Sequence, residues 1–165
     1  MFSSSKELAV ILCSAALLLN AGASLAQEQH NHGHAHYGLE SAQLTLNDGK
    51  KWESDGNLRQ GMSRIRDALN ADLHAIHMGK ATADQYQALA KKIDVQIEFM
   101  MNNCKLEPKA DEMLHLVLAD IVAGSEAMKQ DLGKAREGAG RIAQALQSYG
   151  AHFAHPGWDK AKHAH

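Results

Sequence analysis

Residues 82–104 read TADQYQALAKKIDVQIEFMMNNC, and this stretch decides the class of fold. Thr82 and Gln85 stand three residues apart, in the capping-box pattern that starts a helix. The apolar side chains that follow recur every three or four residues, at Tyr86, Leu89, Ile93, Ile97, Met100 and Cys104. This period is typical of an amphipathic helix with one buried face and differs from the alternation of a strand. The stretch therefore predicts an α-helix.

Three further segments show the same period, one before this helix and two after it. Their boundaries are marked by caps and helix breakers: Ser54 or Asp55 and Gly79 for the first, Pro108 and Gly133 for the next, and Pro156 for the last. Because the connections are short, successive helices should run antiparallel. The sequence predicts an all-α protein, an up-down-up-down antiparallel four-helix bundle over residues 46–156 with flexible His-rich termini.

The first 26 residues have the pattern of a secretory signal peptide. Lys6 precedes an apolar run over residues 8–19, and Ser24-x-Ala26 offers a cleavage site. The run is shorter than the roughly 20 residues that span a bilayer, so we expect no membrane anchor and no integral membrane protein. This pattern predicts a periplasmic protein. Cys104 is the one cysteine expected after cleavage, so no internal disulfide should hold the fold.

Histidines gather at both ends of the chain beyond the signal. Residues 27–45 form a His-rich arm, expected to be flexible, and residues 157–165 form a His-containing tail; the histidines of the arm are His30, His32, His34 and His36. Four imidazoles this close together can wrap Cu(II), Ni(II) or Zn(II) without a folded framework. The alternative is a solubilising segment that gains charge as the pH falls toward about 6.

The composition argues against nucleic-acid binding and favours metal binding. Lys and Arg number 17 against 19 Asp and Glu, and the formal charge of −2 provides no cationic surface for a nucleic acid. The chain holds 11 His and 7 Met beside only 5% aromatic residues. Because imidazole and thioether groups bind transition metals, metal handling is the first hypothesis.

One end of the predicted bundle should gather further metal ligands, and we call this end the lower pole. It is the end at which the first and third helices start and the second and fourth helices finish. The candidate ligands there are Met62, Cys104, His115, His152 and His155. Thioether, thiolate and imidazole together suit Cu(I), or an ion that cycles between Cu(I) and Cu(II). Core packing of Met62 and Cys104, and an Asp111–His115 hydrogen bond, are the structural alternatives, and the sequence leaves both open.

The familiar catalytic and redox motifs are absent from the sequence. It has no C-x-x-C-H for covalent haem, no Gly-rich phosphate loop and no H-E-x-x-H zinc helix. Glu112-x-x-His115 is half of a di-iron signature, but a second Glu-x-x-His is missing. We therefore predict that the protein is not an enzyme.

Four stretches carry a family resemblance: residues 44–52 (LTLNDGKKW), 58–62 (LRQGM), 104–115 (CKLEPKADEMLH) and 155–158 (HPGW). They resemble a family of small exported proteobacterial proteins described as DnrO-like, and the resemblance implies no particular activity. In size and export the chain is also similar to cytochrome b562 and cytochrome c′. That similarity implies non-covalent haem b, with Met62 and His152, or His115, as axial ligands.

Together these features favour a periplasmic transition-metal-binding protein, with copper the favoured ion, that serves in copper buffering, delivery or resistance. The arm histidines would capture the ion, and some of the lower-pole candidates would retain it. The first alternative is a non-covalent b-type haem electron carrier. The second is a structural or adaptor bundle without a cofactor, whose surface binds a protein partner.

Overall fold

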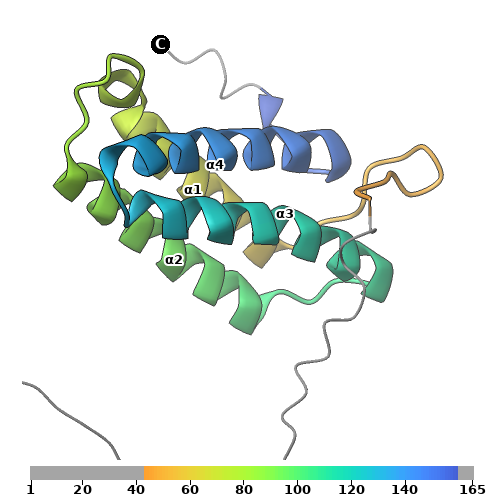
Figure 1. Ribbon diagram of the computed structural model, residues 1–165. Helices are drawn as coiled ribbons and strands as arrows, with labels where there is room; N and C mark the ends of the chain where they lie inside the picture. The colour runs from red at the N-terminus through yellow and green to blue at the C-terminus, as the bar shows by residue number, and fades with distance from the viewer. Residues whose placement is uncertain (1–42, 160–165) are drawn as a thin grey trace, which may run out of the picture. The chain divides into compact units, whose positions relative to one another are not determined.

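The computed structural model describes residues 43–159, which form four α-helices and no β-strand (Figure 1). The helices are α1 (Gly56–His77), α2 (Ala83–Asn103), α3 (Pro108–Met128) and α4 (Leu132–His152). They pack against one another, and the prediction of an all-α four-helix bundle is confirmed. The up-down-up-down order stays a prediction. The arm histidines His30, His32, His34 and His36 lie outside the described residues.

The first two helices begin at the predicted caps. Asp55 precedes α1, and its Oδ1 accepts a hydrogen bond of 2.7 Å from the backbone N–H of Leu58. Thr82 precedes α2, and its backbone N–H donates to Gln85 Oε1 at 2.8 Å while the N–H of Gln85 donates to Thr82 Oγ1 at 3.3 Å. These bonds satisfy backbone groups that the first turn of a helix leaves without a partner.

The boundary between α3 and α4 differs in part from the prediction. Pro108 is the first residue of α3, as expected, because its fixed φ suits a helix start and its missing N–H is not needed there. The prediction that Gly133 ends this helix is wrong. The helix ends at Met128, and Gly133 is the second residue of α4. Asp131 caps α4 by accepting a hydrogen bond from the N–H of Lys134 at 3.1 Å, so a side-chain cap set the boundary rather than the glycine.

The core is continuous along all four helices and uses the apolar stripes seen in the sequence. Its largest fully buried side chains are Tyr149, Phe153, Leu58, Met62, Ile65, Leu89, Ile93, Met100, Ile121, Met128, Ile142 and Val117. Burying an aliphatic side chain of this size contributes about 1.5–3 kcal/mol relative to leaving it in water. Among residues 43–159 Cys104 is a free thiol, and packing of this kind stabilises the described fold.

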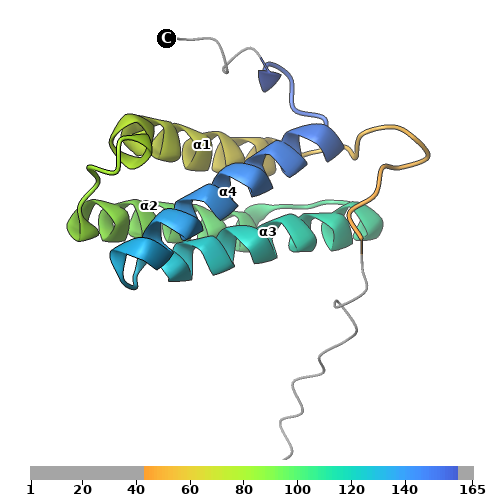
Figure 2. The same ribbon diagram turned by 45° about the horizontal axis from the view of Figure 1, so that its top comes forward.

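Two glycines allow α3 and α4 to approach closely. A methyl group built on Gly124 would lie 2.7 Å from the carbonyl oxygen of Gly138, and one built on Gly138 would overlap the carbonyl oxygen of Gly124. Only glycine leaves room for this backbone contact. The first half of α4 therefore lies directly on α3, and α4 then crosses the bundle obliquely (Figure 2).

The segments that flank the helices pack onto the end of the bundle. Trp52 donates its backbone N–H to the carbonyl oxygen of His152 at 2.7 Å and accepts from the N–H of Ala154 at 2.8 Å. Trp158 is only 4% exposed and lies against Gly150, where a Cβ atom would overlap the indole ring. The ordered body therefore extends past residue 156, into the segment that the sequence assigned to the C-terminal tail.

The four helices of residues 43–159 were not found to include a membrane-spanning segment. None of them is both long enough and apolar enough to cross a bilayer.

Candidate functional site

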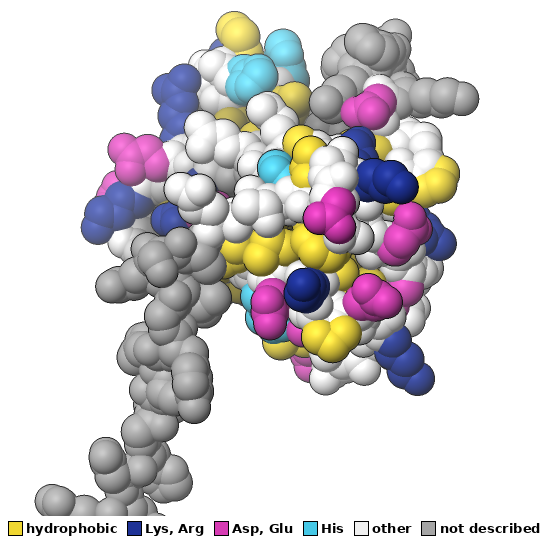
Figure 3. Space-filling model, turned by 90° about the vertical axis from the view of Figure 1, so that its right-hand side faces the viewer, with side chains coloured by type: hydrophobic (Ala, Val, Ile, Leu, Met, Phe, Trp, Pro, Cys, Tyr) yellow, Lys and Arg dark blue, Asp and Glu magenta, His cyan; other side chains and the backbone are white. Residues whose placement is uncertain are grey.

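The lower pole is built from segments that lie far apart in the sequence. Asn57 in the first turn of α1 donates to the carbonyl oxygen of Asn103 at the end of α2, at 2.8 Å. Lys51 donates through Nζ to the carbonyl oxygen of Gly150, near the end of α4, at 2.6 Å. Figure 3 views the bundle from this side and shows a band of hydrophobic side chains bordered by acidic and basic ones.

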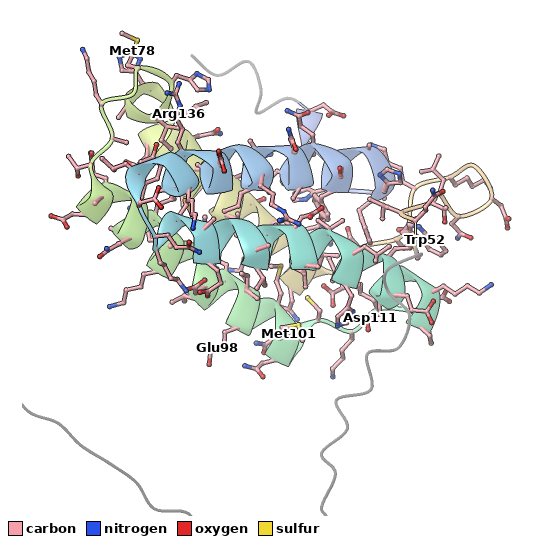
Figure 4. The ribbon with its side chains drawn as sticks, in the orientation of Figure 1. Trp52, Met78, Glu98, Met101, Asp111 and Arg136 are labelled. Atoms are coloured by element: carbon pink, nitrogen blue, oxygen red, sulfur yellow. The ribbon has the colours of Figure 1, made fainter. Side chains whose placement is uncertain are left out.

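Met62 belongs to the core. Its side chain is fully buried. The neighbouring Met100 is 1% exposed and packs across Gly61, where a Cβ atom would come within 2.6 Å of its sulfur. Met101, by contrast, is 59% exposed at the edge of the bundle (Figure 4). The buried position of Met62 supports a packing role.

Cys104 lies at the C-cap of α2 in an acidic environment. Its backbone N–H donates to the carbonyl oxygen of Met100 at 2.9 Å, and the side chain is half-buried. Burial above all, and then the carboxylates of Asp55 and Asp111, together raise the pKa of the thiol to about 12. The thiolate is the form that binds metals and acts as a nucleophile. Cys104 is therefore a protonated thiol at neutral pH, and these neighbours disfavour it as a ligand.

His115 and His152 share one arrangement. His115 Nδ1 donates to the carbonyl oxygen of Asp111 at 2.8 Å, and His152 Nδ1 donates to the carbonyl oxygen of Ser148 at 2.8 Å. Asp111 Oδ2 also lies 3.5 Å from Nδ1 of His115. A backbone acceptor on Nδ1 fixes the tautomer and leaves the lone pair on Nε2, which is the arrangement found in many metal-binding histidines. These two imidazoles keep a nitrogen available.

His155 uses both of its ring nitrogens. Nδ1 lies 3.0 Å from the hydroxyl of Tyr149, and Nε2 lies 3.3 Å from the hydroxyl of Ser63 in α1. Burial lowers the pKa of His155, and the positive charges of Arg66 and Arg59 lower it further. Burial also raises the pKa of Tyr149, so its phenol stays protonated. A neutral imidazole bridges the two hydroxyls with one nitrogen donating and the other accepting.

Trp158 closes this cluster from outside. Its ring centroid lies 4.8 Å from those of Tyr149 and His155. The guanidinium carbon of Arg66 stands 4.3 Å from the indole centroid, and Arg66 donates to the carbonyl oxygen of Trp158 at 3.2 Å. We call Ser63, Arg66, Tyr149, His155 and Trp158 the C-terminal latch. Its contacts join α1 to the segment that follows α4, so His155 has a structural role.

The sequence analysis missed this latch. His155 was assigned as a metal ligand, and residue 158 was assigned to a tail. The available signals were the bulky Trp158 close to the last helix and Gly150 in its last turn, a pair that fits a ring packed on a bare backbone. Ser63 gives no signal of its own, because a serine on a half-buried helix face is common.

Within residues 43–159, no group of three or more His, Cys, Asp or Glu side chains is placed to hold one ion. Of the lower-pole candidates, Met62 lies in the core, Cys104 is a protonated thiol and His155 belongs to the latch. His115 and His152 each keep Nε2 available.

Comparison with known proteins found no protein-family profile, no curated protein and no solved structure that matches the chain. The DnrO-like resemblance stays a prediction.

Proposed function

We propose that this is an exported transition-metal-binding protein that serves in copper buffering, delivery or resistance in the periplasm. One observation carries the proposal: His30, His32, His34 and His36 place four imidazoles within seven residues. Such a segment binds borderline ions without a folded framework, and among divalent ions Cu(II) binds most tightly to nitrogen ligands.

In this proposal the arm histidines capture the ion and residues of the lower pole retain it. His115 and His152 are the bundle residues that fit this role, because each has Nδ1 held by a backbone carbonyl. The burial of Met62 and the two hydroxyl contacts of His155 support packing roles for these residues in the proposal. Cys104 binds copper only after it loses a proton that its acidic neighbours hold in place.

A Cu(II) competition titration with a chromophoric chelator tests the proposal. The variant replaces all four arm histidines by glutamine, and the control replaces the exposed His74 and His77 at the other end of α1 in the same way. We expect the arm variant to lose the tightly bound Cu(II) and the control to keep it. Equal Cu(II) affinity and stoichiometry in all three proteins would contradict the proposal.

A further inference from the structure

A cleft of about 160 Å³ opens between α1 and α4, at the end of the bundle away from the lower pole. Its walls are apolar side chains of both helices, and its rim carries two basic side chains. The lining residues are Leu69, Leu73, Ile76, His77, Arg136, Ala139, Gly140 and Ala143.

The helix packing explains why this space exists. The contact between Gly124 and Gly138 holds the first half of α4 on α3, and in Figure 2 this half of α4 lies away from α1. Along the cleft α4 contributes Arg136, the small side chains of Ala139 and Ala143, and Gly140 between them. A Cβ atom on Gly140 would meet nothing within 4 Å. Leu73 is the partly exposed large side chain of α1 in the cleft, and Leu69 and Ile76, 4% and 6% exposed, form its floor.

Arg136 gives the mouth of the cleft a charge that the described protein leaves unmatched. No hydrogen bond or ion pair joins its guanidinium to another part of residues 43–159. The group lies beside the α1–α2 turn, since a Cβ atom on Gly79 would stand 3.8 Å from one of its terminal nitrogens. Figure 4 shows Arg136 close to Met78 in the same region, at the opposite end of the bundle from Trp52.

We propose that this cleft binds a small carboxylate with an apolar body about the size of a benzene ring. A cavity of about 150 Å³ lined by apolar side chains holds benzene in another protein, and the cleft here has a similar volume of about 160 Å³. The apolar body lies on Leu69, Leu73 and Ile76, and the carboxylate pairs with the guanidinium of Arg136. A charge-assisted hydrogen bond of this kind favours an acid over a neutral molecule of the same shape. This site is independent of the metal-binding proposal.

Benzoate is the probe for the experiment, and benzyl alcohol is its neutral counterpart. Both are titrated into the purified full chain while the methyl signals of Leu69, Leu73 and Ile76 are followed by NMR. We expect saturable shifts with benzoate in the millimolar range, which suits a ligand of this size. If benzoate causes no saturable shift of these methyl signals, the proposal is overturned.

Three variants separate charge from shape. Arg136→Gln should weaken benzoate binding about fivefold and leave benzyl alcohol unchanged. Arg141→Gln is the matched control, because Arg141 lies outside the cleft and pairs with Asp120 on α3 at 2.8 Å. This variant should bind benzoate as tightly as the parent does. Gly140→Leu should abolish binding of both probes without lowering the melting temperature, since its side chain enters empty space. Equal losses in the two arginine variants, or parent-like binding by Gly140→Leu, would refute the site.

Discussion

Replacing Trp158 by alanine tests the C-terminal latch. A tryptophan buries about 200 Å² or more, which at about 25 cal/mol per Å² corresponds to about 5 kcal/mol of transfer free energy as an upper bound. Measured Trp→Ala losses in cores are about 3–5 kcal/mol. Because residue 158 lies in a terminal segment that can relax into the space, we expect Trp158→Ala to lower the free energy of unfolding by about 2–4 kcal/mol.

Urea denaturation followed by far-UV circular dichroism measures this change, and the thermal midpoint should fall by about 10 °C. Val95→Ala is the control, since Val95 is 53% exposed on α2 and its substitution should change the stability by less than about 0.5 kcal/mol. The expected loss of unfolding free energy is thus several times larger for Trp158→Ala than for Val95→Ala. If Trp158→Ala also stays within about 0.5 kcal/mol of the parent, residues 157–159 are a tail and the latch does not stabilise the fold.

Three further predictions follow from glycine packing, the thiol and the latch histidine. Gly138→Ala should destabilise the protein by about 1–3 kcal/mol in urea titrations, because its methyl group overlaps the backbone of α3; unchanged stability would refute the close contact. Cys104 should react slowly with iodoacetamide at pH 8 and rapidly after denaturation, since its pKa is raised to about 12; equal rates would show an ordinary thiol. The lowered pKa of His155 means that the unfolded state takes up a proton first as the pH falls below about 6.5, so native stability falls with the pH in this range. The free energy of unfolding should therefore fall less between pH 7.5 and 5 in His155→Gln than in the parent. If it falls by the same amount in both proteins, His155 does not contribute to the pH dependence.

Local signals in the sequence were sufficient to predict most of the fold. The cap at Asp55, the capping box at Thr82 and Pro108 at the start of α3 act within one helical turn, so they are readable before any packing is known. Gly133 misled the prediction because glycine is tolerated in a first turn and the cap at Asp131 had more influence.

The candidate site was less predictable, because side-chain environments depend on contacts between distant segments. Periodicity placed Met62 on a buried stripe but could not distinguish a ligand from a packed thioether. The raised pKa of Cys104 comes partly from Asp55, which lies 49 positions earlier in the sequence. The latch likewise joins Ser63 to His155, which are 92 positions apart in the sequence. Such contacts leave no trace in the spacing of residues along one helix.

Copper capture by the arm histidines is the step on which the proposed function depends, and metal analysis of untagged protein exported by its own signal measures it. The parent and the variant with His30, His32, His34 and His36 replaced by glutamine are purified from copper-supplemented cells without chelators, and their copper content is measured by mass spectrometry. We predict about one copper ion or more per parent chain and a clear loss in the variant. A parent free of copper, or equal copper in both proteins, would contradict the claim.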